Sequence, residues 1–387
     1  MVPINDSESV FNNSVNFTRL CLLAKDIAST PGINVILILE IFLALAASLP
    51  NVFLMCTIWK VTVFHSNLRL CLAHLSFILF WYSIGYLLKA VILLPVFNGG
   101  DPCSLITEIY ECKIKELGLG IPAQASVYAG MAIALERFYS TVHYKRYDEQ
   151  NERTPVLGIL LLLLTYLVPV ANTINSLAAL TSRTSYLPIC ENTMSATPTS
   201  SSTTLSINLV AMFICVLIVA AVWRINDTKL RVMVANRAKH TLAARFQIEQ
   251  NVQVNKIIVP STFLQMLCFI PNYAFLFLIL VGLPLSIDQK LVLIHCNYIW
   301  KMVFAIMHPL VCVARHARIR NEFYKNLPFM AKLKTRIGPI LNRAKVDHVR
   351  NGLEVGNYGK AMDTHFQMLS NAWNTSAGKD RKDGVKK

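Results

Sequence analysis

Seven long apolar runs alternate with shorter polar segments along the chain. Each run is close to the 20 or so residues that an α-helix needs to cross the hydrocarbon core of a bilayer. The runs cover roughly residues 33–58, 68–94, 117–138, 155–178, 205–223, 257–283 and 291–313. Gly118, Gln124 and Ser126 dilute the third run, as expected of a helix that faces other helices instead of lipid. The pattern predicts an all-α membrane protein, a bundle of seven transmembrane helices.

The composition agrees with a chain that lies mostly in lipid. Of its 387 residues, 54% are hydrophobic and 15% are charged, and the mean hydropathy is +0.46. A soluble domain carries about 25% charged residues, so the composition excludes a soluble fold. The net charge of +15 is not arranged as the basic face of a soluble nucleic-acid-binding domain, and we expect no nucleic-acid partner.

The basic residues indicate how the chain crosses the bilayer. With the amino terminus outside, six of the 37 lysines and arginines fall in external segments and two inside spans, which leaves 29 in the cytoplasm. Seven of these lie between Arg224 and Ile258, and sixteen follow residue 313. Because cytoplasmic loops are enriched in Lys and Arg, this asymmetry predicts an extracellular amino terminus and a cytoplasmic carboxyl terminus.

Segments outside the spans give further expectations. Three glycosylation acceptors of the form Asn-x-Ser/Thr, at Asn5, Asn12 and Asn16, lie in the predicted extracellular segment 1–32. That segment lacks the basic start and compact apolar stretch of a cleavable signal peptide, so we expect none. Apolar residues at helical spacing among the bases of 224–258 predict that the fifth and sixth helices continue into the cytoplasm.

Segments within and after the predicted receptor domain, 33–313, give further expectations. The low-complexity stretch 195–206 is expected to be flexible. In the predicted cytoplasmic segment 314–387, residues 315–327 have an apolar side and a basic side, which fits an amphipathic helix on the inner leaflet. Beyond about residue 345, glycine, asparagine, serine and charge predict disorder.

Cysteines on the predicted outer side permit disulfides, because that compartment is oxidising. These cysteines are Cys21, Cys103, Cys112 and Cys190, with Cys296 nearby. A Cys112–Cys190 bond would join the top of the third span to the loop before the fifth. Cys21–Cys103 is the second pairing that we consider.

Ionisable residues inside the spans mark candidate functional sites, because burying a charge in a membrane is costly. Glu40 and Lys89 lie in the outer third of their helices, and Lys301 lies about two turns deeper than the outer end of the seventh. Glu40 could form a purely structural ion pair with either lysine. A lysine left over would receive an anionic or carbonyl-bearing ligand, with added hydrogen bonds from Gln124, Asn272 and Tyr273.

An adjacent acid–base pair, Glu136 and Arg137, ends the third span. A buried unpaired charge costs on the order of several kcal/mol, so we expect Glu136 to hold Arg137 until an outward swing of the sixth helix releases it. The alternative is an arginine that merely extends to the membrane surface. Pro271 is expected to kink the sixth span, either as a lever or as a tolerated proline.

Several of these residues resemble motifs of rhodopsin-like G-protein-coupled receptors. Cys112 lies 25 residues before Arg137, the distance that those receptors keep between their bridging cysteine and their acidic–Arg–aromatic motif. The other similar elements are Glu136-Arg137-Phe138, Asn51 in the first span, Leu72-Ala73 in the second and Cys268-Phe269-Ile270-Pro271 in the sixth. Departures are Ser76 in place of the second-span aspartate and His308-Pro309 in place of Asn-Pro.

With these departures, the stretches ALERFYST and RFQIEQN are similar to nematode serpentine chemoreceptors of the Sra-type superfamily. Of its classes alpha, alpha/beta, beta and epsilon, alpha/beta is our first choice. The resemblance implies a receptor of the plasma membrane, which includes the membrane of sensory cilia. Such a receptor detects a small-molecule odorant or pheromone and activates a heterotrimeric G protein. Glu136 and Arg137 would couple to the G protein. No cofactor or metal is implied.

Other classes of protein remain as alternatives. The sequence contains no HExxH, P-loop or GxSxG motif, so we expect no enzyme. Its runs do not repeat as the related halves of a transporter. A ligand-gated odorant channel with inverted topology would need the opposite charge bias. A retinal-binding photoreceptor would use Lys301, but this lysine precedes Pro309 by eight residues, and opsins place theirs seven residues before.

Overall fold

The computed structural model describes residues 16–30, 32–61, 64–143, 155–178, 186–191, 198–235, 242–280 and 286–326. Seven of its helices are long and apolar enough to cross a membrane. They are α3 (Ile33–Lys60), α4 (Ser66–Phe97), α6 (Leu117–Val142), α8 (Val156–Ala178), α10 (Pro198–Ala235), α11 (Leu242–Leu280) and α12 (Ile287–Arg315). The predicted all-α, seven-helix architecture is therefore confirmed.

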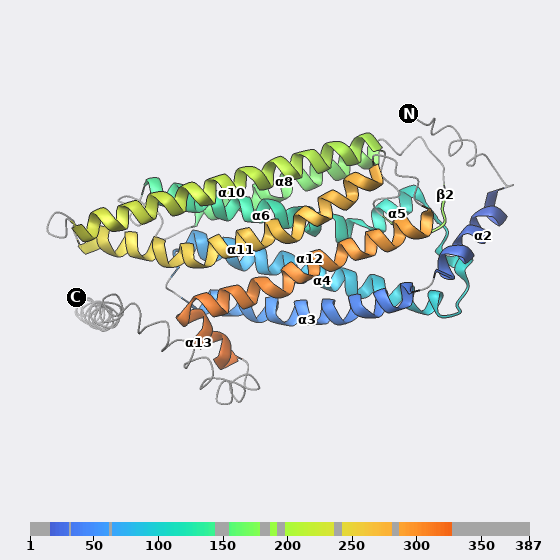
Figure 1. Cartoon of the computed structure of the whole chain (residues 1–387), viewed down its shortest axis with the longest axis horizontal. Helices are drawn as coiled ribbons and strands as arrows, with labels where there is room; N and C mark the ends of the chain where they lie inside the picture. Colours follow the sequence, from blue (N-terminus) through green and yellow to red (C-terminus); the bar gives the residue numbers. More distant parts are fainter. Residues whose placement is uncertain are drawn as a thin grey trace, which may run out of the picture. The chain divides into compact units, whose positions relative to one another are not determined.

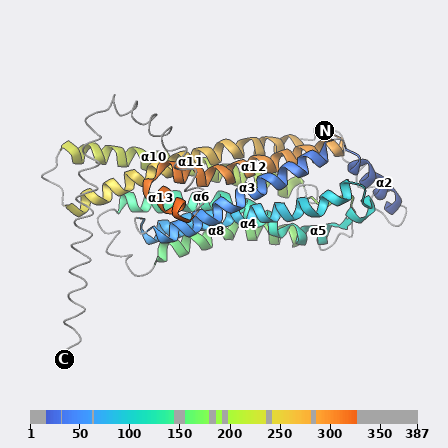
Figure 2. The same ribbon diagram turned by 90° about the horizontal axis from the view of Figure 1, so that it is seen from below.

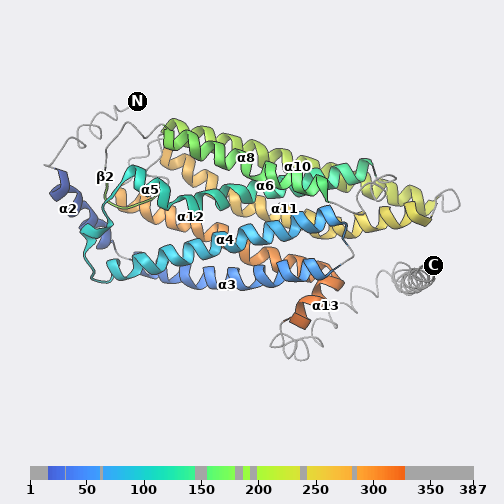
Figure 3. The same ribbon diagram turned by 180° about the vertical axis from the view of Figure 1, so that it is seen from behind.

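The seven helices lie side by side as a bundle (Figure 1). Helix α3 packs against α4 on one side and α12 on the other, and α11 lies between α10 and α12 (Figures 2 and 3). Helix α6 contacts α4, α8, α10 and α11, which makes it the most buried of the seven. Its dilution by small and polar residues, noted in the sequence, follows from this central place.

Glycines let neighbouring helices approach α6 closely. A Cβ atom added at Gly130 of α6 would lie 2.5 Å from the side-chain oxygen of Gln265 on α11. One added at Gly85 of α4 would meet a methyl group of Leu119 on α6 at 2.4 Å. Close approach at small residues is the usual way that membrane helices gain packing contacts, because lipid provides no hydrophobic force between helices.

Short elements gather at one end of the bundle, which we call the disulfide end. They are α2 (Asn16–Ala28), the 3-10 turn η2 (Pro102–Leu105), β1 (Thr107–Glu108), α5 (Ile109–Lys115) and β2 (Tyr186–Leu187). The strands β1 and β2 pair antiparallel, with Thr107 opposite Leu187. Disulfides join Cys21 to Cys103 and Cys112 to Cys190. Both pairings considered from the sequence are therefore present in the structure.

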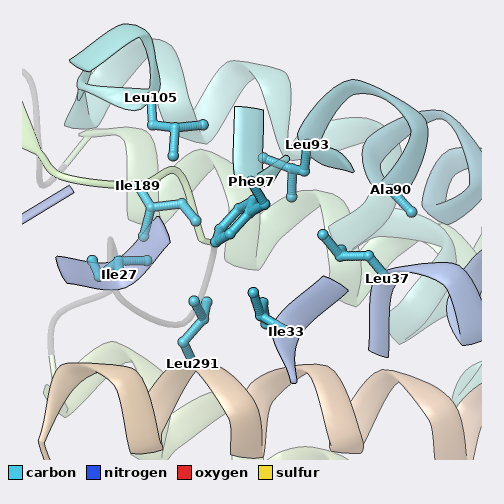
Figure 4. Close-up of a cluster of buried hydrophobic side chains, with 9 residues drawn as sticks. All are labelled: Ile27, Ile33, Leu37, Ala90, Leu93, Phe97, Leu105, Ile189 and Leu291. Atoms are coloured by element: carbon cyan, nitrogen blue, oxygen red, sulfur yellow. The ribbon is translucent and has the colours of Figure 1, made fainter. Parts of the chain in front are cut away.

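An apolar cluster fixes this end to the bundle. Its nine side chains come from α2, α3, α4, η2, α12 and the segment that follows β2. Figure 4 shows these side chains around the ring of Phe97. Ile189 is fully buried here, one residue before Cys190 and two before Glu191. The packing of Ile189 and the Cys112–Cys190 disulfide therefore both hold the backbone that carries Glu191.

The structure differs from the sequence-based expectations at two elements. Helix α2 was not predicted; it has 13 residues, of which Leu20, Ala24 and Ile27 are buried. The stretch 195–206 was expected to be flexible, but α10 begins at Pro198 and includes the rest of it. Helices α10 and α11 continue past the apolar runs, as predicted, and extend beyond the other spanning helices (Figure 1). We call this opposite end of the bundle the arginine end, after Arg137.

Helix α13 (Ala317–Asn326) matches the amphipathic helix predicted over 315–327. Its apolar side packs on α3, where the Phe323 ring meets the Phe53 ring edge-to-face at 6.5 Å. The compact unit that contains the bundle ends at Asn326, the last residue of α13. Asn5, Asn12 and the segment beyond residue 345 lie outside the described residues, and Asn16 is described as the first residue of α2.

Candidate functional site

A cavity of about 180 Å³ lies between the helices at the disulfide end. Residues of α4, α5, α6, α8, α10, α11 and α12 form its wall, whereas α3 contributes none. A cavity of about 150 Å³ holds benzene, so this one suits a ligand somewhat larger than benzene. Leu119, Ala123, Leu205 and Leu276 supply apolar surface for such a ligand.

Amide and hydroxyl groups give the cavity its polar lining. The Asn172 side-chain nitrogen donates to the Gln124 oxygen at 3.2 Å. Asn272 on α11 and Asn297 on α12 also line the cavity, and both are buried. Their side-chain oxygens have no hydrogen-bond donor within the part of the chain that the structure describes. Two acceptors at this wall are thus available to a ligand.

Two lysines, Lys113 and Lys301, line the same cavity. Burial lowers the pKa of Lys113 to about 8, and the nearby Glu116 carboxylate opposes that change only in part. The Lys301 Nζ lies 6.0 Å from the centre of the Phe269 ring. Among the described residues, no carboxylate lies within ion-pair distance of Lys301 Nζ.

Beside the cavity lies a buried charge cluster, formed by Glu40, Lys89, Glu116, Glu191 and His295. Lys89 Nζ is 2.8 Å from a carboxylate oxygen of Glu116 and 2.8 Å from one of Glu191. His295 Nδ1 is 2.9 Å from Glu40 Oε1, and its Nε2 is 3.8 Å from Glu191 Oε1. The cluster joins α3, α4 and α12 to the two segments that the Cys112–Cys190 bond ties together.

The two carboxyls outside the spans respond differently to this environment. Burial alone would raise the pKa of Glu191, but the Lys89 ammonium, His295 and the Tyr298 hydroxyl hold it below its ordinary value. Tyr298 donates to Glu191 at 2.6 Å. Burial raises the pKa of Glu116, and Lys89 offsets that effect only in part. Glu191 is therefore the fixed anion of the cluster, and Glu116 is the first of these two carboxyls to take a proton.

The structure separates the six residues predicted for the ligand site into two groups. Gln124, Asn272, Tyr273 and Lys301 line the cavity. Glu40 and Lys89 do not, and the expected pairing of Glu40 with a lysine is wrong. Glu40 pairs with His295, and Lys89 pairs with two glutamates. The reason is geometric, because helix rotation turns Glu40 toward α12 and Lys89 toward the loop segments.

Sequence reasoning missed His295, Glu116 and Glu191. His295 was detectable, because it is an ionisable residue inside an apolar run. Glu116 and Glu191 lie at or beyond the span ends, where charge is ordinary, and only the fold shows that they are buried. Their one signal was proximity to the two disulfide cysteines, Cys112 and Cys190.

At the arginine end, the side chain of Arg137 is buried together with that of Glu136. Its Nε and Nη2 donate to the two Glu136 carboxylate oxygens at 2.5 Å each. Its Nη1 donates to the side-chain oxygen of Asn251 on α11 at 3.2 Å. The pair expected from the sequence thus also holds α6 to α11. Asn251 was not predicted, although it closes the RFQIEQN stretch.

Further polar contacts tie α11 and α12 to their neighbours. Gln265 of α11 donates to the backbone oxygen of Ser126 on α6 at 2.8 Å. The hydroxyl of Ser261 on α11 lies 2.8 Å from His308 Nδ1 on α12. Asn51 of α3 donates to the backbone oxygen of Ala305 on α12 at 2.7 Å. His308, which replaces the expected asparagine before Pro309, therefore holds the sixth and seventh spans together.

The structure is a seven-helix bundle. At one end a disulfide-tied segment lies beside a cavity, and at the other end lies a buried Glu-Arg pair. This is the architecture of a G-protein-coupled receptor. The family described as serpentine type 7TM GPCR receptor class ab chemoreceptor matches residues 19–337, and the chain belongs to this family. It is 24% identical over 340 residues to serpentine receptor class alpha/beta-14 of Caenorhabditis elegans, covering 80% of each chain. The choice of the alpha/beta class is confirmed, and this is a receptor family, not an enzyme family.

Proposed function

We propose that this protein is a chemosensory receptor that binds a small odorant or pheromone in the cavity and activates a heterotrimeric G protein at its arginine end. The observation that carries the proposal is the path of α11. This single helix places Asn272 and Tyr273 at the cavity wall and Asn251 at Arg137. At 1.5 Å per residue the two places are about 30 Å apart along the helix. A ligand that displaces α11 at one end therefore acts on Arg137 at the other.

Release of Arg137 is the step that we assign to activation. In the resting receptor its charge is compensated by Glu136 and its position is fixed by Asn251. Pro260 and Pro271 lie within α11, between and beside these contacts. Prolines leave backbone groups unbonded and favour bending there. A bend at these prolines would move Asn251 away and leave the guanidinium for the G protein.

The proposed orientation places the disulfide end outside the cell. Disulfides belong to an oxidising compartment, and the arginine end carries the basic segment 224–258. N-glycans at Asn5, Asn12 and Asn16 would then be external. A tag at the amino terminus should be labelled on intact cells, and one at the carboxyl terminus only after permeabilisation. Labelling of both tags on the same face would contradict the proposal. It would also contradict an inverted channel, whose two termini likewise lie on opposite faces.

The photoreceptor alternative is less well supported by the cavity. Lys301 lines it, as a retinal-linked lysine would. However, a volume of about 180 Å³ is close to that of a benzene site, and retinal is far larger than benzene. A visible absorbance band on adding retinal to the purified receptor would revive this alternative.

The direct test is calcium imaging of cells that express the receptor, screened against volatile and soluble odorants. Arg137→Ala should abolish the response of an active compound while surface expression stays at the wild-type level. The matched control is Arg231→Ala, because Arg231 forms an exposed pair with Asp227 on the same helix. A full response from Arg137→Ala would contradict the assigned coupling site.

A further inference from the structure

We infer that the ligand of this cavity is a small organic carboxylate that also carries a hydrogen-bond donor. The inference rests on the proposed function, since it takes the cavity between the helices as the ligand site. It adds the charge and hydrogen-bonding pattern of the ligand, which follow from three groups at the cavity wall: Lys301, Asn272 and Asn297.

The first step is the charge of the wall. Lys301 brings an ammonium group to the cavity, and the carboxylate among the described lining residues is that of Glu116. Glu116 is already engaged by Lys89 at 2.8 Å, and Lys89 does not line the cavity. The wall therefore has an excess of positive charge, and an anionic ligand would compensate it.

The second step concerns Lys301 alone. Its side chain lines the cavity, where the described contact of the ammonium is with the ring of Phe269 on α11. A cation–ring contact at 6.0 Å is weak compensation for a desolvated charge. A carboxylate at this place would form a charge-assisted hydrogen bond, the stronger kind of polar contact. A neutral ester or aldehyde would leave the ammonium without a counter-ion.

The third step is the pair of oxygens from Asn272 and Asn297. Both residues are more than nine-tenths buried, and both line the cavity. Each side-chain oxygen lacks a donor within the described ranges. A buried acceptor without a donor is unfavourable, so a ligand with a hydroxyl or N–H group gains affinity here. A simple fatty acid would satisfy Lys301 but not these oxygens.

The experiment measures binding to the purified full-length receptor by thermal shift and by ligand-observed NMR, so that no G protein is needed. Three matched probes separate the features: para-hydroxyphenylacetate, phenylacetate and the methyl ester of para-hydroxyphenylacetate. The hydroxy acid should bind most tightly, phenylacetate more weakly and the ester at least about tenfold more weakly. Equal binding of acid and ester, or no binding of either acid, would overturn the inference.

Variants assign the effect to residues. Lys301→Met should weaken binding of the hydroxy acid at least about tenfold and leave the ester unchanged, whereas Lys301→Arg should retain binding of the acid. Lys115→Met is the matched control, because Lys115 lies in an exposed pair with Glu111. The thermal transition itself shows that each variant is folded. Tight acid binding by Lys301→Met would contradict the inference.

The two proposals fail in different ways. If neutral compounds bind and activate the receptor while the acids do neither, the carboxylate inference is wrong and the proposed function stands. If the acids bind through Lys301 but no G protein responds in cells, the inference stands and the proposed coupling is wrong.

Discussion

The guanidinium of Arg137 contacts both carboxylate oxygens of Glu136 and the side-chain oxygen of Asn251. The Glu136 contact lies within α6 and cannot by itself restrain another helix. The Asn251 contact crosses to α11, so it resists separation of the two helices. At the scale of single residues, charge compensation and helix restraint are therefore assigned to different partners of the same arginine.

This division predicts that Asn251→Ala raises signalling in the absence of ligand. A hydrogen bond to a charged group contributes about 1.5–3 kcal/mol, so its loss should shift the resting equilibrium roughly ten- to a hundredfold toward the active state. Basal reporter activity at matched surface expression measures this shift. Asn255→Ala is the control, because Asn255 is buried one turn along α11 and its side-chain nitrogen has no partner among the described residues. Wild-type basal activity in Asn251→Ala would exclude a restraining role.

Glu116 and Glu191 share Lys89 but should not be equivalent. Glu191→Gln leaves Lys89 and His295 without their common anion, and breaking a buried pair in this way costs about 3–5 kcal/mol. Glu116→Gln removes one of the two anions beside Lys89 and leaves the other, Glu191, in place. We expect a large loss of melting temperature for Glu191→Gln at pH 7 and a small change for Glu116→Gln, measured on receptor in detergent.

The same two carboxyls have opposite effects on stability as the pH falls. The pKa of Glu116 is higher in the folded receptor than the ordinary 4.5, so the folded state binds this proton first and gains stability from neutral pH toward 4.5. The pKa of Glu191 is lower than 4.5, so its contribution is lost only below that value. Glu116→Gln should therefore reduce the gain in stability that the receptor shows as the pH falls from neutral to 4.5. An unchanged pH profile would show that Glu116 is ionised throughout.

At the scale of helices, the sequence predicted that seven spanning helices exist more accurately than it predicted where each helix ends or how each is rotated about its axis. The run 117–138 corresponds to α6, which continues to Val142. Apolar content marks where a chain enters lipid, but a helix ends where its backbone finds other partners. Contacts between side chains of different helices are harder still to predict from the sequence. Glu40 and His295 are 255 residues apart, and only the rotations of α3 and α12 bring them to 2.9 Å. No spacing along the chain encodes those rotations.

Helix α13 provides a prediction at this scale. His316 precedes it and accepts the backbone N–H of Ile319 through Nδ1 at 3.3 Å, which requires the neutral ring. Burial, assisted by Arg318, lowers the pKa of His316 to about 4, against 6.5 for an exposed histidine. Its contribution to stability is therefore complete above pH 6.5 and is lost as the pH falls toward 4.

Hydrogen exchange of residues 317–326, corrected for intrinsic rates, should thus accelerate between pH 6.5 and 4. His316→Asn keeps an acceptor at the helix start and should remove the pH dependence, whereas His316→Ala should weaken the helix by about 0.5–2 kcal/mol at pH 7. Equal protection of this segment at both pH values in the wild type would contradict the capping role.

At the scale of the receptor, the two disulfides at the same end serve different parts of the structure. Cys21–Cys103 joins α2 to η2, and neither cysteine adjoins a member of the charge cluster. Cys112–Cys190 joins α5 to the segment of Glu191, whose carboxylate reaches Lys89 and Tyr298. The second bond therefore fixes the anion on which the cluster depends.

Loop length makes the two bonds a matched pair for experiment. They connect cysteines 82 and 78 residues apart, so the loss of chain entropy that each imposes on the unfolded state is nearly equal. Removing either bond should cost about 2–5 kcal/mol on that account. Cys112→Ser/Cys190→Ser should cost more than Cys21→Ser/Cys103→Ser, because it also frees Glu191. Adding Glu191→Gln should then lower the melting temperature further only in the receptor that keeps Cys112–Cys190. Equal losses from the two double variants, with Glu191→Gln equally harmful in both, would show that packing around Ile189 alone positions the cluster.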